Sequence, residues 1–402
     1  MSKTALKVIL SIVISITTVV LISVVYWQKN LPLVSPVAFI ESIYQPSTKN
    51  KRIVYGFLPY WNLKYAKELQ INHLTHLAYF GLDLKSDGTA NKKVNARELE
   101  PGWNKLNSDT TKNILYQSKL LNQKTVLTVT AMEPEIISSI VNNQTYTQNS
   151  INDILQVYKD FNFDGINIDF EYVGIPDEVT KKNFTNYIKL INQECKKSYP
   201  KCFIDIDIFG DTAEKNRLWN LEELHPHVSH IIVMAYDYYR KSSSQAGPVA
   251  PLTGSCKGQS DNPCLEHDIL QHISLITKKV PQNKIILGIP FYGYEWQTAS
   301  EDFLANTYPK TGSIATYQRI QEIITNPETS SLSAKWSNST LSPYLVYYED
   351  KKIKQIHYEN QQSLKLKIDV LNATNLGGMA IWALGYEVPY QDLWQPIFEM
   401  NR

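Results

Sequence analysis

The sequence predicts a (β/α)8 barrel, because eight short apolar runs recur along it with amphipathic stretches between most of them. The chain has 402 residues, of which 43% are hydrophobic, so it can bury one large core. Alternating strands and helices indicate a parallel sheet, and eight such units favour its closure. A doubly wound open sheet is the alternative. The expected strands lie near Ile53–Phe57, Leu74–Phe80, Thr125–Thr130, Gly165–Glu171, Phe203–Phe209, His230–Tyr236, Lys284–Phe291 and Gly378–Ala383.

Amphipathic intervals between these runs predict the helices, while one long interval breaks the pattern. The stretch 295–356 is rich in aromatic residues and short apolar runs, such as Tyr344–Tyr348. It predicts a small α+β insertion between strands seven and eight, at the barrel mouth, where loops shape the substrate site. The barrel, including this insertion, is expected to span 52–402. The expected helices are Thr110–Leu121, Ile151–Phe161, Glu178–Lys197, Leu265–Lys278 and Gln361–Leu371.

The first thirty residues have a different character. Val8 to Trp27 is an uninterrupted run of apolar and hydroxylated residues, long enough to cross a bilayer, and it follows Lys3 and Lys7. We expect residues 1–30 to form an uncleaved transmembrane anchor, with 31–51 as a linker and the remaining chain extracytoplasmic. A cleaved signal, giving a secreted protein, and a buried soluble helix are the alternatives.

The net charge argues against nucleic acid as a partner, and the cysteine spacing favours disulfides over a metal site. The formal net charge of +1 offers no basic surplus for binding nucleic acid. The four cysteines form two close pairs, Cys195 with Cys202 and Cys256 with Cys264, and in an exported protein each pair is a candidate disulfide. A zinc site would favour tighter Cys-x-x-Cys spacing, and four unrelated thiols remain an alternative.

The strand expected at Gly165–Glu171 carries the strongest sign of chemistry. Alternation places Asn167, Asp169 and Glu171 on one face, with backbone spacings of roughly 7 Å. A central strand buried on both sides directs these polar groups into the interior, where acids usually serve catalysis. Glu171 ends the strand at the mouth, so a shielded position beside a second carboxylate would raise its pKa and suit a general acid. A buried acid network that holds the barrel together is the structural alternative.

Two further strand ends carry candidate binding groups. The sixth strand places Met234 and Tyr236 on one face and brings Asp237 to the following turn. The eighth strand alternates small residues with Trp382, whose indole would form a floor for the apolar face of a sugar. An ordinary strand terminus and a plain core tryptophan are the structural alternatives.

Four motifs together resemble glycoside hydrolase family 18. They are Asp-Gly-x-Asn-x-Asp-x-Glu at 164–171, Met-x-Tyr-Asp at 234–237, Leu-Gly-Ile-Pro-Phe-Tyr-Gly-Tyr at 287–294 and Gly-Gly-Met-Ala-Ile-Trp at 377–382. Their order along Arg52–Arg402 is that of the family, which includes chitinases, chitobiases, peptidoglycan-type N-acetylglucosaminidases and inactive sugar-binding members. The resemblance implies a hydrolase that needs no metal or cofactor.

The resemblance also implies a retaining mechanism in which the substrate's N-acetyl carbonyl attacks the anomeric carbon. Glu171 would protonate the leaving oxygen, and Asp169 would orient the acetamido group. Tyr236 and Asp237 would hydrogen-bond that group. The expected substrate-binding residues are Asn167, Met234, Trp382, Tyr292, Trp61 and Phe80, and further candidate sugar platforms are Tyr55, Phe57, Tyr60 and Trp296.

Two departures from the family pattern bear on substrate and pH. Many chitinases carry Asp at the position of Asn167, so we expect Asp169 to ionise more easily here. The third strand, Leu127–Met132, lacks the Ser-x-Gly-Gly pattern frequent in chitinases. The insertion between strands seven and eight favours chitin, whereas the anchor and Asn167 favour peptidoglycan. We expect hydrolysis of β-1,4 bonds in chitin or chitooligosaccharides, with peptidoglycan N-acetylglucosaminidase activity and a catalytically inactive sugar-binding protein as the alternatives.

Overall fold

A computed structural model describes residues 52–255, 264–326 and 330–401, and its centre is a closed barrel of parallel strands. The barrel closes because β1 pairs with both β2 and β13, which confirms the predicted barrel and excludes the open sheet. The order around it is β1-β13-β7-β6-β5-β4-β3-β2. The strands are β1 (Ile53–Pro59), β2 (His76–Asp83), β3 (Lys124–Ala131), β4 (Gly165–Phe170), β5 (Phe203–Phe209), β6 (His230–Met234), β7 (Ile285–Pro290) and β13 (Gly378–Trp382).

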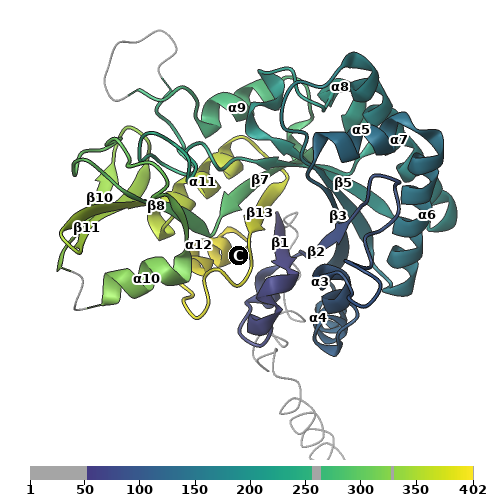
Figure 1. Cartoon of the computed structure of the whole chain (residues 1–402), viewed down its shortest axis with the longest axis horizontal. Coiled ribbons are helices and arrows are strands. Elements are labelled where there is room, and N and C mark those ends of the chain that lie inside the picture. Colours follow the sequence, from purple (N-terminus) through teal and green to yellow (C-terminus); the bar gives the residue numbers. More distant parts are fainter. Residues whose placement is uncertain (1–51, 256–263, 327–329, 402) are drawn as a thin grey trace, which may run out of the picture. The chain divides into compact units, whose positions relative to one another are not determined.

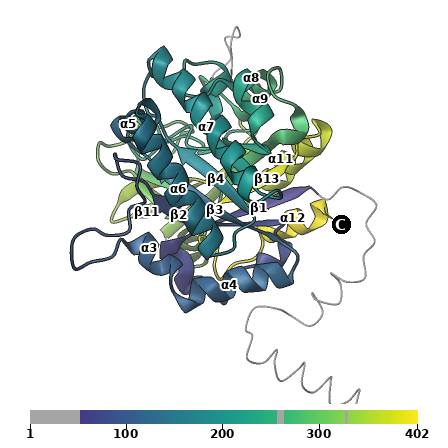
Figure 2. The same cartoon turned by 90° about the vertical axis from the view of Figure 1, so that its right-hand side faces the viewer.

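Helices cover the outside of this barrel, as Figure 2 shows for α5, α6 and α7. The longest of the described helices, α7, buries Phe184, Ile188 and Ile191 at helical spacing, and Phe184 lies 6.1 Å from the ring of Phe170 on β4. Helix α6 starts well before the predicted Ile151, because the side chain of Asn143 caps its first turn. The helices are α3 (Pro101–Leu106), α4 (Asp109–Leu120), α5 (Pro134–Asn142), α6 (Gln144–Asp160), α7 (Glu178–Ser198), α8 (Leu221–Leu224), α9 (Ile269–Ile276), α11 (Gln361–Ala373) and α12 (Trp394–Met400).

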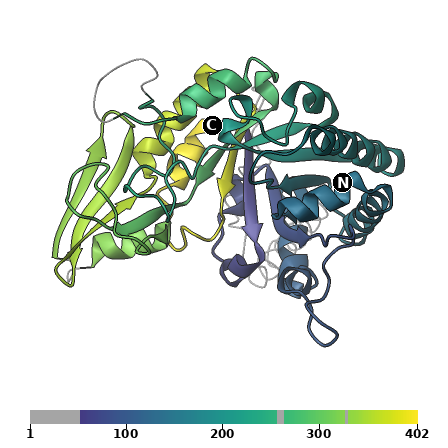
Figure 3. The same cartoon turned by 45° about the horizontal axis from the view of Figure 1, so that its top comes forward.

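Between β7 and α11 the chain forms a second, antiparallel sheet in the order β10-β11-β12-β8-β9. This sheet and α10 lie to one side of the barrel, away from α6 and α7 (Figures 1 and 3). The sheet begins at Tyr292, slightly before the predicted 295, because β8 follows β7 almost directly. The elements are β8 (Tyr292–Gln297), β9 (Ser313–Thr316), α10 (Tyr317–Thr325), β10 (Ser330–Ser337), β11 (Ser342–Glu349) and β12 (Lys352–His357).

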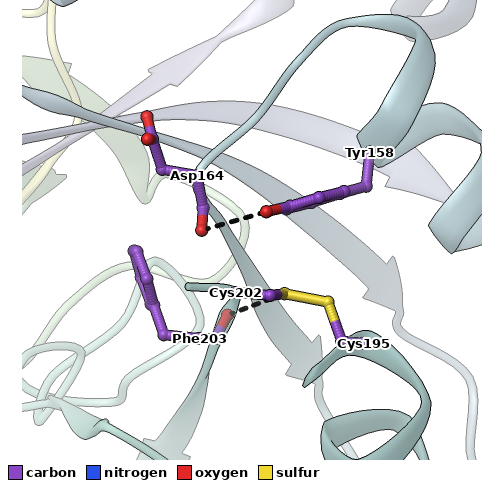
Figure 4. The surroundings of a disulfide bond; sticks show 5 residues. All are labelled: Tyr158, Asp164, Cys195, Cys202 and Phe203. Carbon is purple, nitrogen blue, oxygen red and sulfur yellow. Dashed lines mark hydrogen bonds between the residues drawn. A yellow bond between two sulfur atoms is a disulfide. The ribbon is translucent and has the colours of Figure 1, made fainter. Parts of the chain in front are cut away.

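A disulfide joins Cys195, near the end of α7, to Cys202, just before β5 (Figure 4). The two Cα atoms are 6.0 Å apart, within the usual range for a bridged pair. The bridge closes the short connection into β5 beside the ring of Phe203, and it confirms the first predicted cysteine pair. The second pair, Cys256 with Cys264, lies partly outside the described residues.

The predicted membrane anchor, Val8 to Trp27, and the linker 31–51 lie outside the described residues. Within 52–255, 264–326 and 330–401, no helix is both long enough and apolar enough to span a bilayer.

Candidate active site

The carboxyl ends of the parallel strands meet at one mouth of the barrel, where β4 brings its polar row. Asn167 is completely buried and Asp169 is 4% exposed, so both side chains lie inside the barrel. Glu171 directly follows the strand and is half-buried at the rim. Its backbone N–H donates to the carbonyl of Ala131 on β3, at 3.0 Å, which fixes the start of the following loop. The predicted row from interior to mouth is therefore present.

A fourth polar residue, Asp207 on β5, joins this row and was missed by the sequence reasoning. The amide nitrogen of Asn167 donates to its carboxylate at 2.7 Å, and Asp207 is 3% exposed. The signal was available, because Asp205 and Asp207 alternate along a buried strand just as Asn167 and Asp169 do. Asp205 does not reach the mouth. It accepts a hydrogen bond from the backbone N–H of His230, at the start of β6.

The pKa values of the two buried acids, Asp169 and Asp207, are raised, and no cation is among the causes. Burial raises the pKa of Asp169 well above its ordinary value, and the neighbouring carboxylates of Asp207 and Glu171 raise it further. Burial likewise raises the pKa of Asp207, although the hydrogen bond from Asn167 opposes that rise. The rise at Asp169 is relative to an ordinary Asp, so the expectation that Asp169 ionises more easily than it would beside an Asp at position 167 stays a prediction; Asp207 nevertheless supplies a second carboxyl close to Asp169.

Glu171 has the same tendency to stay protonated. Burial raises its pKa, the carboxylate of Asp237 raises it further, and the guanidinium of Arg240 partly opposes both. A carboxylic acid with a raised pKa at the mouth of a barrel can donate a proton to a leaving group.

The loop after β6 places Tyr236 and Asp237 opposite the carboxyl row. Burial, followed by the charges of Asp207, Asp169 and Glu171, raises the pKa of Tyr236, so its hydroxyl remains a donor. Gly288 on β7 leaves room for this ring, since a Cβ there would lie 3.0 Å from Cε1 of Tyr236 and 2.5 Å from a backbone oxygen.

Asp237 is held by two tyrosines of β8. It adopts a φ of 62°, a left-handed conformation in which Asp is enriched among non-glycine residues. Its Oδ1 accepts hydrogen bonds from the hydroxyls of Tyr292 and, at 3.0 Å, Tyr294. Tyr292 is only 5% exposed, so its hydroxyl binds Asp237 while its ring offers little surface to a ligand. Met234, the last residue of β6 and the predicted neighbour of Tyr236 on one face, is half-buried.

Aromatic rings from β1, β2, β13 and the loop after β1 gather around Trp382. Ring centroids lie 4.7 Å apart for Trp382 and Phe80, 6.0 Å for Trp61 and Phe80, and 6.4 Å for Trp61 and Trp382. Phe57 packs 5.9 Å from Trp382. Trp61 is 41% exposed, so this cluster offers an apolar surface to solvent.

Three of the four further candidate platforms are core residues instead, and one of them is Phe57, which is 3% exposed. Tyr55 is completely buried and stacks on His76 with ring centroids 5.2 Å apart. Trp296 is 1% exposed and packs within the second sheet, 5.8 Å from Tyr294. Aromatic residue type alone did not separate these core rings from the exposed Trp61.

Comparison with known proteins gives one family over most of the chain. The model of glycosyl hydrolases family 18 matches residues 41–387. A Bacillus subtilis protein named as a sporulation-specific glycosylase, YdhD, is 23% identical over 70% of this chain and 61% of its own length. The cortical fragment-lytic enzyme of Bacillus subtilis is 21% identical over 82% of this chain and 68% of its own length. Chitinase 1 of Aphanocladium album is 24% identical over 78% of this chain and 76% of its own length.

Solved structures share the fold at low identity. The Group IV chitinase of Ostrinia furnacalis, solved with allosamidin, has a TM-score of 0.73 and 20% identity over 87% of this chain and 97% of that one. The spore cortex-lytic enzyme SleL of Bacillus megaterium has a TM-score of 0.67 and 17% identity over 89% of this chain and 76% of that one.

Proposed function

The chain belongs to family 18 of the glycosyl hydrolases, and on that premise we propose that it hydrolyses β-1,4 bonds after N-acetylglucosamine units of chitin or its oligosaccharides. The observation that carries the proposal is the convergence of Asp169, Glu171, Asp207 and Tyr236 at the mouth of the barrel, with no cation among the causes that raise the pKa of Asp169. Such a set favours proton transfer to a leaving oxygen.

In the proposed mechanism Glu171 is the general acid. Its raised pKa keeps the proton available, and its place at the rim lets the glycosidic oxygen approach. After the leaving group departs, the resulting carboxylate takes a proton from the incoming water, which restores the acid.

The nucleophile in this proposal is the carbonyl oxygen of the substrate's own acetamido group, so the product retains the β configuration. Asp169 orients the acetamido N–H and balances the positive charge that develops on the cyclic intermediate. Asp207 shares the proton of this buried pair, and Asn167 fixes the position of Asp207 through its amide. Tyr236 donates its hydroxyl proton to the acetamido oxygen, while Asp237 positions the loop that carries Tyr236.

Trp382 forms the floor of the cleavage subsite in this proposal, and Trp61 extends that apolar surface outward with Phe80 behind it. The support is their edge-to-face packing and the exposure of Trp61. Indole faces suit the apolar faces of N-acetylglucosamine rings.

Peptidoglycan is the second candidate substrate. The match to a cortical fragment-lytic enzyme spans 82% of this chain, and β3 lacks the Ser-x-Gly-Gly pattern. We also propose an extracytoplasmic location, with the apolar run before the barrel as its anchor. The Cys195–Cys202 disulfide supports this location, because such bridges persist in oxidising compartments.

The test is hydrolysis of chitin tetramer and of muramidase-resistant peptidoglycan side by side, with product sizes and the first anomer followed by NMR. Cleavage of the tetramer with the β-anomer formed first supports the chitin proposal. Cleavage of peptidoglycan alone reverses the order of the two substrates, and the α-anomer formed first contradicts the substrate-assisted mechanism.

A further inference from the structure

A second group of side chains that could hold a metal ion lies outside the proposed catalytic row, at and before helix α9. Figure 1 shows the place of α9 in the fold. Glu214 follows the short helix Gly210–Ala213 after β5, His267 precedes α9, and His272 lies within it. One ligand atom from each residue lies within 4.8 Å of the other two. Oε2 of Glu214 is 3.3 Å from Nδ1 of His267 and 3.7 Å from Nε2 of His272.

The two ring nitrogens that face Glu214 make no hydrogen bond within the described part of the chain. His272 is 4% exposed, and the His267 side chain is 14% exposed. A buried nitrogen without a hydrogen-bonding partner is costly, and two of them directed at one carboxylate need an explanation. A bound cation would accept both lone pairs. The carboxylate of Glu214, which accepts a hydrogen bond from Nε2 of Gln271 at 3.4 Å, lies beside them as a third ligand.

The opposite nitrogen of each ring has the partner that a metal ligand needs. Nε2 of His267 lies 2.9 Å from Oε1 of Glu266, and Nδ1 of His272 lies 2.8 Å from the hydroxyl of Tyr238. When each of these nitrogens donates its proton, the nitrogen facing Glu214 holds a lone pair. Histidine ligands commonly donate their second N–H to such outer groups, which fix the ring and its tautomer.

We propose that Glu214, His267 and His272 bind a divalent transition metal of the zinc class, with solvent as the fourth ligand. Two imidazoles and a carboxylate suit zinc, whereas calcium and magnesium prefer oxygen ligands alone. In a tetrahedral zinc site, bonds of about 2.0–2.1 Å place neighbouring ligand atoms about 3.3 Å apart, close to the observed spacing of Glu214 from His267. Nε2 of His272 lies 3.7 Å from Glu214, so the proposal requires this ring to move closer when the ion binds.

The metal would link the segment after β5 to the start of α9, and its role is structural. Tyr238 directly follows Asp237, so the bond between Tyr238 and His272 connects the metal to the loop after β6. Gly210 leaves room for that bond, since a Cβ there would lie 3.0 Å from Nδ1 of His272 and 3.4 Å from the hydroxyl of Tyr238. Hydrolysis at Glu171 does not use the ion.

The first test is metal binding by the full chain, prepared without a histidine tag and treated with a chelator. Titration calorimetry with Zn²⁺ should give one equivalent, and Co²⁺ should give the intense visible absorption of a four-coordinate site. The unfolding midpoint should rise with Zn²⁺ concentration, because only the folded chain presents all three ligands. Folded protein that binds neither ion overturns the proposal.

Variants then locate the site. His272→Ala and Glu214→Gln should abolish the Co²⁺ absorption, and Tyr238→Phe should weaken Zn²⁺ binding by about 10–100-fold through loss of the outer hydrogen bond. His227→Ala, which alters a histidine outside the cluster, is the matched control and should bind as the parent does. If the variants bind Zn²⁺ with parental affinity, the site lies elsewhere and the assignment is wrong. Circular dichroism confirms that each variant is folded before it is scored.

Discussion

Buried acids in the second sheet and at the barrel mouth have opposite surroundings. In the second sheet, the side chain of Glu295 is 3% exposed, and both of its carboxylate oxygens have partners. It accepts a hydrogen bond from Tyr347 at 2.8 Å and forms ion pairs with Arg319 at 2.9 Å and Lys354 at 3.5 Å. At the barrel mouth, Asp169 and Asp207 are equally buried, yet each has an oxygen without a hydrogen-bonding partner in the described residues.

The difference separates a structural acid from a set available for chemistry. Ion pairing satisfies Glu295 and holds β8, α10 and β12 together. At the mouth, burial raises the pKa values of Asp169 and Asp207, and the neighbouring carboxylates raise them further. Each of these two acids keeps an oxygen without a hydrogen-bonding partner among the described residues. Unsatisfied buried acids reduce stability, so their presence at the strand ends is the physical signature of a site.

The largest effect should follow from Glu171→Gln, which removes the proton donor and keeps the shape. Turnover of chitin tetramer should fall by about 10²–10⁴-fold, the usual contribution of a general acid, while the binding of the tetramer and the unfolding midpoint change little. Steady-state kinetics and calorimetry check both. Glu178→Gln is the control, since that side chain is 80% exposed at the start of α7. Unchanged turnover in Glu171→Gln would remove Glu171 from the proposed mechanism.

Glu295→Gln should give the opposite result. It leaves Arg319 and Lys354 without their shared carboxylate, and we expect a loss of about 2 kcal/mol in the free energy of unfolding, below the ~3–5 kcal/mol of a fully buried pair because Arg319 is 46% exposed. Turnover per folded molecule should be preserved. Urea unfolding measures the loss. Glu349→Gln, whose side chain is 53% exposed beside the same Lys354, should cost far less.

The sequence predicted the placement of polar residues at the barrel mouth along one strand, but not the contacts between neighbouring strands. Alternation in 164–171 was enough to place Asn167, Asp169 and Glu171 in a row, because side-chain direction along a strand follows from the backbone. The role of Asp207 depends on how side chains of neighbouring strands meet inside the barrel, since β5 carries two alternating acids. The backbone register pairs Asn167 with Asp205, whereas the Asn167 side chain donates to Asp207. Single-strand patterns contain no such information.

The starts of some helices and the roles of some aromatic residues could not be predicted from the sequence for a similar reason. Asn143 begins α6 through its side-chain cap, in a stretch without strong apolar periodicity, and α5 just before it was not predicted. Tyr55 and Trp61 are both aromatic residues near β1, yet one is fully buried and the other is 41% exposed. Their separation depends on tertiary packing, which residue type does not report.

Asp207→Asn should stabilise the protein, because it removes a buried carboxyl group that the nearby carboxylates of Glu171 and Asp205 repel. A buried acid with a raised pKa contributes stability below the pKa of its unfolded form, and that contribution is lost as pH rises towards the folded pKa. The free energy of unfolding of the variant should therefore be about 1 kcal/mol higher than that of the parent at pH 7, and this gain should shrink towards pH 4. Its amide oxygen still accepts from Asn167. Urea unfolding across this range measures the difference, and equal stability at both pH values would contradict the proposed repulsion.

The smallest effect concerns Arg240, the only cation among the causes that set the pKa of Glu171. Its guanidinium lowers that pKa, so Arg240→Gln should raise it and move the basic limb of the kcat/KM profile to higher pH. The Arg240 side chain is 58% exposed and lies 3.9 Å from Asp237, so the effect should be that of an exposed pair, about 0.2–1 kcal/mol, and should shrink in high salt. Lys241→Gln removes the same charge one residue further along and is the matched control. A downward shift, or equal shifts in both variants, would mean that long-range charge rather than Arg240 tunes the acid.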